Sequence, residues 1–595
     1  MVRQIFRSGL DRLLSVGVTM LLAACGGGGS SSVDGPVGMA DADEQSTAAS
    51  GPLAVTLEAP QRVAPGSDIG LRWQAQGGAV RFAVFVQHAA GFGFVPADAV
   101  ITGHAARLKR GAAWRYDFPT AQVRVQGCNR EGRCVHSEAR PLTEVLLAGV
   151  VRVDAVGLGP DSLFSTRVAL DGSGRTLMAA EPLDGRANDP AFPGKGSIFH
   201  FDRSAEGAWT QQARLERFTV RNSFGERMAL SSDGSTLAVG VPADVGQVGG
   251  INAPEVGAGI PSGMPDGRGG VHIYVRSPGG PWQHQAFLKA AETRYNEQVG
   301  LGVSLSANGN RLLAGSQERT LLFTREGSRW REDWVFERRR PGGVWLGPGA
   351  VISGDGLSVA IRASGGFEGE NATTGYLAVH VFRPCPCATG WRRVADLRSS
   401  KPMQMPDFVD SDEFGAGFAF SHDGRILAVS AALDRGNAQD QGDGGTGEVS
   451  RSGAVYVFAR GEGDAWERQA FLKARAAEVG DEMGNGVAIS ADGRVIVARA
   501  CGLAANAGGV RRNHAEGAQP GLGSDVDCAF YGASAYVFER SSDGQWSHVA
   551  AVVPAPNELV SAAFFSFALS ADAQTLAFGA ITFSLTGRDG RVIVY

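Results

Sequence analysis

The chain has 595 residues, of which 43% are hydrophobic, and its net charge at pH 7 is −5. Charges of both signs are dispersed along it and the sequence pI is near 6.1, so the composition excludes the basic surface on which nucleic-acid binding depends. The length allows large buried cores, and 84 glycines suit a fold with many tight turns.

The first 25 residues have the pattern of an export signal. Three arginines precede a short apolar run, 13–22, which is followed by Leu22-Ala23-Ala24-Cys25. The run is too short to span a membrane as a helix. Leu-Ala-Ala-Cys resembles the bacterial lipobox, and this resemblance implies that Cys25 carries acyl chains such as palmitate and becomes the first residue of the mature protein. The alternative is a plain signal peptide in which Cys25 has no role.

Two segments separate this signal from the rest of the chain. Residues 26–51 are rich in Gly, Ser and Ala without periodicity, so we expect a disordered linker. Residues 52–143 contain alternating apolar stretches bounded by turn residues, which predicts a small β-domain with Trp73 in its core. Cys128 and Cys134 would close one of its hairpins. The domain resembles a fibronectin type III or immunoglobulin-like sandwich.

The remainder of the chain is a repeat organised around a hairpin. Phe224–Gly240 reads FGERMALSSDGSTLAVG, in which two apolar strands flank an Asp-Gly turn. The pattern occurs seven times in all. The second turn residues of the seven copies are Gly174, Gly234, Gly309, Gly356, Gly424, Gly493 and, in a degenerate copy, Ala573.

Two further strands follow each hairpin. One is an apolar strand such as GGVHIYV from Gly269 or SGAVYVF from Ser452, and the other begins at a tryptophan. The tryptophans are Trp209, Trp282, Trp330, Trp391, Trp466 and Trp546. A four-stranded unit cannot bury both of its faces alone, so the units must stack. Radial closure is the solution that leaves only short edges, and residues 144–595 are therefore predicted to form a seven-bladed β-propeller.

The three signatures in this order resemble the FG-GAP repeats of integrin α-chain propellers in their bacterial form. The resemblance covers about residues 150–595. The Phe-Gly pair is intact at Phe224-Gly225 and Phe414-Gly415, and is replaced by Val299-Gly300, Met483-Gly484 and Leu346-Gly347 elsewhere.

The last repeat contains no tryptophan-led strand. The stretch 143–150 before the first repeat matches that strand in size and pattern, so we expect it to pair beside Val592–Tyr595 and close the ring.

Six cysteines remain after Cys25 is set aside (7 − 1), which is an even number in an oxidising compartment. Cys501 and Cys528 flank a long insert and are predicted to pair. Cys385 and Cys387 form a Cys-Pro-Cys sequence that either closes a local bridge or stays reduced.

No catalytic signature is present in the sequence. His272 and His380 fall within predicted strands, where a structural role is favoured. Ser231-x-Asp233-Gly-x-Thr236 is similar to the Asp-box of sialidase-like propellers, but Leu237 replaces the tryptophan that ends that motif. We therefore interpret it as a turn in which the Asp side chain binds its own backbone.

Calcium is the only cofactor that the sequence suggests. Integrin-type propellers hold Ca²⁺ in an Asp-x-Asp-x-Asp-Gly loop, because the ion takes six to eight oxygen ligands. Asp434, Asn437, Asp440 and Asp443 occupy the corresponding region at a spacing of three rather than two. Asp410 and Asp412 form a second candidate set, and a solvated acidic loop is the alternative in both places.

Long inserts are predicted on one face of the propeller, at 241–269, 431–452 and 500–533, whereas the Asp-Gly turns are on the other. A rigid scaffold with long loops on one face is typical of a binding protein. The predicted binding residues are Arg499, Arg511, Arg512 and Asn513, together with the acidic residues of 431–452.

The sequence therefore predicts a non-catalytic, monomeric, lipid-anchored protein of the cell envelope, with outer-membrane anchoring favoured by analogy. We expect it to bind a protein or a glycan on the insert face. The alternative is a glycan-active hydrolase or lyase on the same scaffold.

Overall fold

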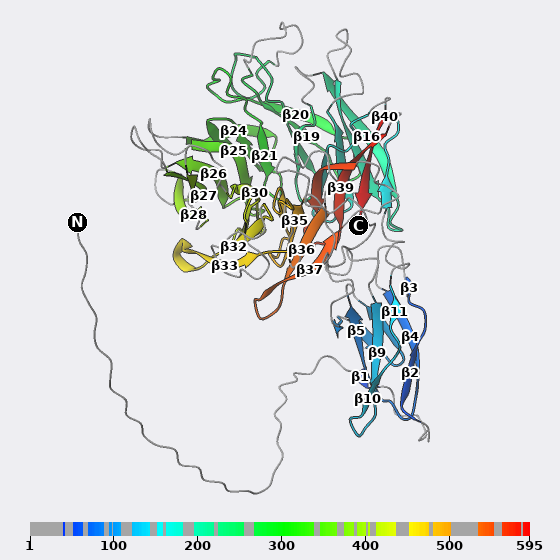
Figure 1. Cartoon of the computed structure of the whole chain (residues 1–595). Coiled ribbons are helices and arrows are strands. Elements are labelled where there is room, and N and C mark those ends of the chain that lie inside the picture. The colour runs from blue at the N-terminus through cyan, green and yellow to red at the C-terminus, as the bar shows by residue number, and fades with distance from the viewer. Residues whose placement is uncertain are drawn as a thin grey trace, which may run out of the picture.

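The computed structural model describes residues 40–41, 52–62, 69–87, 94–97, 99–108, 122–142, 151–158, 162–182, 195–218, 224–254, 267–337, 345–365, 374–385, 390–399, 403–404, 412–435, 451–474, 480–500, 534–552, 562–584 and 587–595. This part of the chain is all-β and consists largely of four-stranded antiparallel sheets, an arrangement that matches a β-propeller (Figure 1). No helix in these ranges is long and apolar enough to cross a membrane.

Two sheets precede the repeats. The first contains β1 (Ala40–Asp41), β5 (Arg81–Gln87), β6 (Val95–Pro96), β9 (Gln122–Cys128), β10 (Cys134–His136) and β11 (Arg140–Pro141). The second contains β2 (Ala54–Leu57), β3 (Gln61–Arg62), β4 (Ile69–Gln76), β7 (Ala99–Thr102) and β8 (Ala105–Leu108). Their apolar residues share one core, in which Trp73 is buried as predicted. The predicted Cys128–Cys134 disulfide joins β9 to β10.

The predicted linker 26–51 is not wholly irregular. Ala40 and Asp41 form β1, which pairs with Phe82 and Arg81 of β5. Backbone groups on the open edge of β5 accept this short segment because edge strands present unpaired N–H and C=O groups. The first sheet therefore begins before the predicted domain boundary at residue 51.

Seven further sheets follow, which we number in chain order. Sheet 1 contains β13 (Arg167–Leu170), β14 (Thr176–Glu181), β15 (Lys195–Arg203) and β16 (Trp209–Phe218). Sheet 2 contains β17 (Arg227–Leu230), β18 (Thr236–Gly240), β19 (Val271–Val275) and β20 (Gln283–Leu288). Sheet 3 contains β21 (Gly302–Leu305), β22 (Arg311–Gly315), β23 (Arg319–Glu326) and β24 (Arg329–Glu337).

Sheet 4 contains β25 (Trp345–Ile352), β26 (Val359–Gly365), β27 (Thr374–Pro384) and β28 (Trp391–Arg398), with β29 (Met403–Gln404) beside β27. Sheet 5 contains β30 (Phe414–Phe420), β31 (Ile426–Ala431), β32 (Ala454–Arg460) and β33 (Trp466–Leu472). Sheet 6 contains β34 (Val487–Ile489), β35 (Val495–Ala500), β36 (Ser534–Arg540) and β37 (Trp546–Val552).

Sheet 7 is assembled from both ends of the repeat region. It contains β38 (Ala562–Leu569), β39 (Leu576–Ser584), β40 (Gly587–Val594) and β12 (Val151–Val153). The pairs are Val151 with Val594, Arg152 with Ile593 and Val153 with Val592. The predicted partner, 143–150, lies outside the described residues. The strand that joins the two ends is therefore the stretch directly after it, which buries Val153.

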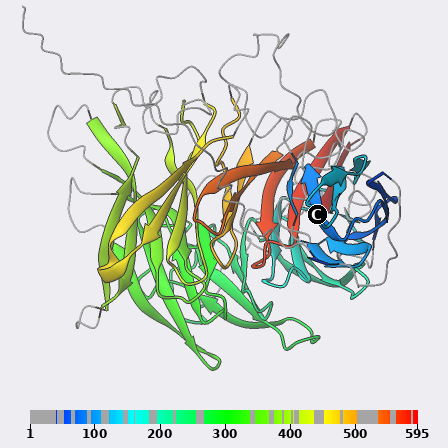
Figure 2. The ribbon, with the colours of Figure 1, turned by 90° about the horizontal axis from the view of Figure 1, so that it is seen from below.

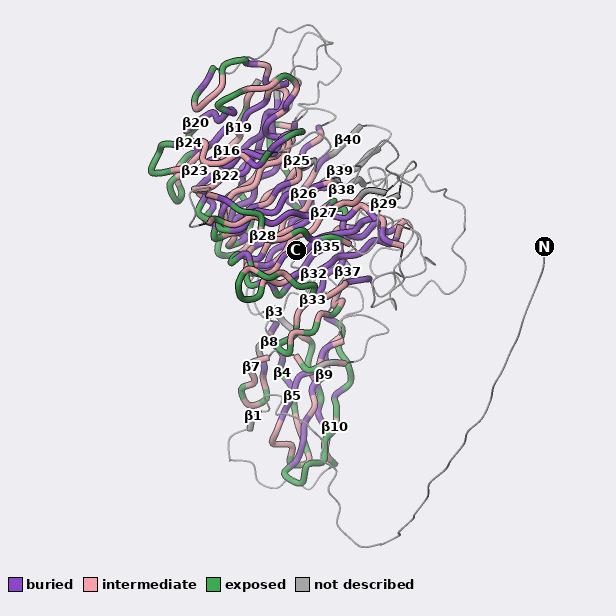
Figure 3. Tube along the Cα trace, turned by 90° about the vertical axis from the view of Figure 1, so that its left-hand side faces the viewer, coloured by how far each residue is buried: buried purple, intermediate pink, exposed green. Residues whose placement is uncertain are grey.

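The first strands of the seven sheets contact one another in cyclic order: β13, β17, β21, β25, β30, β34, β38 and back to β13. Second and third strands are largely buried, whereas stretches of the outer strands β20, β24 and β33 are exposed (Figure 3). The C-terminal residue Tyr595 packs against the core of the N-terminal β-domain (Figure 2). We call the line enclosed by the seven first strands the axis.

The tryptophan-led strands share a feature that the sequence pattern does not reveal. In sheets 1 to 6 the pairing of the third and fourth strands shifts by one residue, and the extra residue is always the third after the tryptophan, as with Gln285 after Trp282. A bulge of this kind increases local twist. Because the bulge lies at the same position in all six sheets, the six outer strands twist at the same place.

Apolar-glycine pairs occupy the spaces between sheets. Phe224, Val299, Phe414 and Met483 are fully buried, and the glycine after each has a positive φ between 78° and 107°. A Cβ atom on Gly484 would lie 2.5 Å from the side chain of Ser430. This conformation and this contact require glycine. The pattern thus inserts a buried side chain beside the neighbouring sheet and then turns the chain sharply.

Candidate functional site

The two ends of the axis differ in chemistry. One end, which we call the turn end, consists of the hairpin turns between first and second strands. The other, which we call the insert end, consists of the links between sheets and the long loops after second strands.

Successive turns at the turn end are joined by backbone hydrogen bonds. The donor–acceptor pairs are Gly172 N–Ser232 O (2.7 Å), Asp233 N–Ala307 O (3.2 Å), Ala307 N–Gly354 O (2.9 Å), Asp355 N–His422 O (2.8 Å), His422 N–Ala491 O (2.9 Å), Ala491 N–Ala571 O (2.7 Å) and Ala571 N–Gly172 O (3.0 Å). The chain of bonds returns to its starting residue, so the seven turns form a closed ring, which we call the turn ring.

The turn ring narrows this end of the axis. If neighbouring turns are about 5 Å apart between Cα atoms, as paired strands are, a ring of seven is roughly 11 Å across between opposing Cα atoms. Side chains largely fill a ring of this width. A cavity of about 180 Å³ remains, and one aliphatic or aromatic residue from nearly every first strand lines it, such as Leu230 and Phe420. His422 packs on Gly354, where a Cβ atom would lie 2.4 Å from its ring. Steric crowding therefore restricts most ring positions to small residues.

Each turn is held by its own side chains. Ser231 Oγ donates to Asp233 Oδ1, and the same oxygen accepts the N–H of Ser235 at 2.9 Å. Sheets 4 to 7 repeat this arrangement at Asp355, Asp423, Asp492 and Asp572. The predicted interpretation of the Asp-box-like motif as a self-bonded turn is confirmed, since these carboxylates bind backbone groups of the turn.

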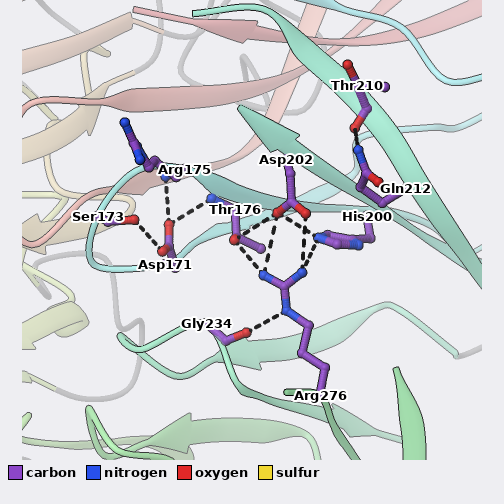
Figure 4. A network of polar contacts seen from close by, with 10 residues as sticks. All are labelled: Asp171, Ser173, Arg175, Thr176, His200, Asp202, Thr210, Gln212, Gly234 and Arg276. Atoms are coloured by element: carbon purple, nitrogen blue, oxygen red, sulfur yellow. Dashed lines mark hydrogen bonds and ion pairs between the residues drawn. The ribbon is translucent and has the colours of Figure 1, made fainter. Parts of the chain in front are cut away.

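Arginines at the ends of third strands tie neighbouring sheets together near the turn end (Figure 4). Arg276 stacks on Trp282 and donates to Thr176 Oγ1 at 2.7 Å in sheet 1. It also contacts His200 and Asp202. Burial lowers the pKa of His200, and the charges of His200 and Arg276 lower the pKa of Asp202 although burial acts against them.

The same contact recurs at two further junctions between sheets. Arg325 reaches Thr236 Oγ1 in sheet 2, and Arg203 reaches Thr575 Oγ1 in sheet 7. The second of these crosses the junction between the two ends of the repeat region. This network therefore serves cohesion between sheets.

Arginines also converge at the insert end, on the axis. Arg167 Nε and an Nη of Arg227 both donate to the carbonyl oxygen of Glu226, each at 3.0 Å. Arg227 Nε donates to Leu301 O at 2.8 Å. Burial, then the charges of Arg227 and Arg499, lower the pKa of Arg167 to about 10, although Glu226 acts in the opposite direction. The guanidinium groups of Arg227 in sheet 2 and Arg499 in sheet 6 therefore both lie close enough to Arg167 in sheet 1 to act on its charge.

Strained backbone also occurs at the insert end. Gln298, Glu413 and Glu482 each precede an apolar-glycine pair and have φ of 60°, 54° and 45°. Glu413 pairs with Arg362, and Glu482 pairs with Arg451. Left-handed backbone in residues other than glycine costs free energy and is common at functional sites. The insert end thus combines charge with strain.

Buried lysines hold the bases of two long inserts. Lys473, which is 2% exposed, places its Nζ 2.6 Å from Asp434 Oδ1, 2.8 Å from Ser452 Oγ and 2.9 Å from Gly453 O. In sheet 2, Lys289 pairs with Asp244 and donates to Gly246 O at 2.6 Å. Both lysines end the sequence QAFLK. The lysine repeated at the end of this pattern is therefore the sequence signal for a residue that holds the base of an insert, a role not predicted above.

The predicted calcium ligand Asp434 therefore has an ammonium group against its carboxylate. Asn437, Asp440, Asp443 and Asp410 lie outside the described residues, and Asp412 accepts the N–H of Phe414 at 3.1 Å. No cluster of three or more His, Cys, Asp or Glu suited to a metal occurs in the described part of the chain. Calcium binding stays a prediction, and Lys473 gives a physical reason to expect that Asp434 does not contribute.

Of the predicted binding residues, Arg499 lies on the axis rather than in the insert that follows it. It is half-buried near the end of β35. Burial lowers its pKa, whereas the charge of Glu482 raises it. Arg511, Arg512 and Asn513 lie outside the described residues, as do Cys25, Cys501 and Cys528.

The remaining sequence predictions concern histidines and the Cys-Pro-Cys segment. His272 and His380 are buried within β19 and β27, as expected for structural residues. Burial lowers the pKa of His380 to about 4, so this side chain is neutral near pH 7. Cys385 is disulfide-bonded, which excludes the reduced alternative for that residue.

No family model matches the chain, and no curated protein matches it. Among solved structures, it is similar to a putative 6-phosphogluconolactonase from Bacteroides uniformis, with 10% identity, a TM-score of 0.37, and coverage of 80% of this chain and 97% of the other. Hydrazine synthase from Kuenenia stuttgartiensis shows 13% identity and a TM-score of 0.38, with coverage of 74% and 96%. The β-propeller domain of Cps50 (Swd1) from Myceliophteria thermophila shows 13% identity and a TM-score of 0.38, with coverage of 74% and 99%. Similarity at this level assigns no activity.

The buried Lys473–Asp434 pair gives a test of what holds the insert bases. Lys473→Met should destabilise the protein by roughly 3–5 kcal/mol, because it leaves a buried carboxylate without its cation. The double variant Lys473→Met/Asp434→Leu should recover much of this loss. Chemical denaturation followed by circular dichroism measures both.

The matched control is Arg425→Met, which removes an exposed pair with Asp423 whose side chains are 69% and 58% exposed. It should cost less than about 1 kcal/mol. A loss for Lys473→Met as small as that of the control would contradict the assignment. A rise in wild-type stability on adding Ca²⁺, reversed by EDTA, would show instead that the loop takes a metal ion.

Proposed function

We propose that residues 144–595 form one seven-bladed β-propeller of the FG-GAP type, in which the seven sheets are the blades. The cyclic order of first-strand contacts supports this proposal, as does the pairing of β12 with β40. We also propose that residues 52–143 are a fibronectin III- or immunoglobulin-like sandwich, because residues from both of its sheets share one core. Its role would be to carry the propeller.

The function that the geometry supports best is non-catalytic binding of a protein or a glycan at the insert end. The observation that carries this proposal is the difference between the two ends of the axis. The turn end is a ring of backbone hydrogen bonds around a small cavity, whereas the insert end presents arginines, strained acidic residues and the bases of the long loops. Specific recognition needs polar groups held by a rigid scaffold. At the turn end, the aspartates and Arg276 are already bonded to the turns and to neighbouring sheets.

A glycan-active hydrolase or lyase is the second candidate. The innermost strands consist largely of small and aliphatic residues, but Arg167 and Arg227 begin two of them and Arg499 lies beside them. These arginines make a glycan-active enzyme a stronger candidate than the sequence alone made it. However, Glu413 and Glu482 are each paired with an arginine. A general acid needs a raised pKa, which such pairing opposes.

Anchoring at Cys25 belongs to the same proposal, with the protein exported and held at the envelope, in the outer membrane by analogy. The Cys25→Ser variant should move the protein from the membrane fraction to the soluble extract, because a lipid anchor requires the thiol. Immunoblotting of fractionated cells measures this. Retention of the variant in the membrane fraction would refute lipid anchoring.

Binding at the insert end is tested by shortening two inserts, 436–450 and 502–527, to a few glycines. Folding should be unchanged by circular dichroism, because surface loops tolerate length changes at small free-energy cost. Binding to the partner found in a glycan and envelope-protein screen should be lost. The control is an insertion of a few glycines after Gly279, in an exposed turn of sheet 2. Binding that survives both loop deletions would move the site elsewhere, with the N-terminal domain as the next candidate.

A further inference from the structure

We propose that the arginines on the axis bind a carboxylate carried by an acidic sugar, with Arg227 as the principal contact and Arg167 and Arg499 beside it. This proposal rests on the proposed binding function and specifies the ligand chemistry of the insert end.

The geometry at Glu226 brings two guanidinium groups together. Arg167 and Arg227 come from different sheets and donate to the same carbonyl oxygen. Backbone carbonyls therefore fix the orientation of both planes before any ligand arrives. Fixed orientation matters because less conformational freedom is then lost when an anion binds.

Arg227 retains donors for a ligand. Its hydrogen bonds within the described residues use Nε, to Leu301 O, and one terminal nitrogen, to Glu226 O. Its other terminal nitrogen makes no hydrogen bond within the described residues, and the side chain forms no ion pair there. A guanidinium group has five N–H donors, and a carboxylate accepts two of them in parallel.

The local electrostatic field favours an anion. The charge of Arg227 lowers the pKa of Arg167 more than the charge of Glu226 raises it, and Arg499 acts in the same direction as Arg227. Glu482, whose charge acts on Arg499, is itself paired with Arg451. An incoming carboxylate would therefore meet positive charge that internal acids only partly offset.

Acidic charge beside these arginines limits the class of ligand. Glu226, whose charge acts on Arg167, would repel a densely charged polymer such as a nucleic acid or a polyphosphate. A uronic acid presents one carboxylate among neutral hydroxyl groups. Neutral hydrogen-bonding side chains also lie at this end, including Gln298 and Gln317, which bond to each other at 2.6 Å. Single charges spaced by hydroxyl groups fit this arrangement best.

The test compares galacturonate with galactose, its neutral counterpart, by isothermal titration calorimetry on the purified full chain. Galacturonate should bind and galactose should not, and the affinity should fall several-fold when the salt concentration rises from low to physiological. Arg227→Gln should weaken binding at least tenfold. Arg227→Lys should recover only part of it, because an ammonium group cannot bind both carboxylate oxygens in parallel.

The control is Arg425→Gln, which removes an exposed arginine at the turn end and should bind galacturonate like the wild type. Equal binding of galactose and galacturonate, or unchanged binding by Arg227→Gln, would overturn the proposal. If that variant fails to fold, the comparison of the two sugars with the wild type decides. Acetate or an acidic peptide binding in place of galacturonate would also overturn the sugar assignment. A third outcome is that galacturonate fails to bind while shortening the loops still abolishes binding of the partner found in the screen. That combination would refute the acidic-sugar assignment and leave the proposed binding function intact.

Discussion

Seven backbone hydrogen bonds between successive hairpin turns are the constraint on which the rest of the repeat region depends. The turn ring fixes the distance between first strands, because each turn both donates to one neighbour and accepts from the other. This explains why small residues predominate between the serine and the aspartate of the turn. It also explains the exception, since the bulky His422 lies against Gly354, which has no side chain.

Because the turn end is held by the ring, differences in loop length between the repeats occur at the insert end. Insertions there do not disturb the ring, and each long loop needs only a firm base. Lys289 and Lys473 provide such bases in sheets 2 and 5. Sheet 3 has only a short loop at this place, and its Arg319 pairs instead with Glu297 in the link from sheet 2. Buried ion pairs of this kind are sensitive to the loss of either partner, which makes them suited to specifying one loop conformation. Strain at Glu413 and Glu482 accumulates at the same end.

Much of the fold could be predicted from the sequence, because the strands alternate with a period of two and the turns carry Asp-Gly. The positive φ at all seven second turn residues, from Gly174 to Ala573, agrees with that prediction. Strand β12 was expected one segment too early, because several short apolar stretches near residue 150 fit the same edge. Arg499 was predicted to bind as a residue supplied by an insert, but it lies within strand β35.

Other features could not be predicted because they depend on contacts between repeats. Arg167 and Arg227 look like ordinary strand-end residues, and only the closed ring brings them to one carbonyl oxygen. The bulge three residues after each tryptophan cannot be recognised from the residue type at that position, which is Gln212, Asp333 or Val394 in different sheets. Lys473 was visible as a repeated residue, but its partner lies far away in the chain.

The central claim is that the turn ring is a cooperative structural element rather than a set of exposed loops. Residue-resolved amide hydrogen exchange tests it most directly. The ring amides, Gly172, Asp233, Ala307, Asp355, His422, Ala491 and Ala571, should exchange as slowly as the amides of the second strands, because opening one bond requires movement of neighbouring sheets. Exchange of these amides at the rate of the hairpin turns between third and fourth strands, such as Gly279, would contradict the account.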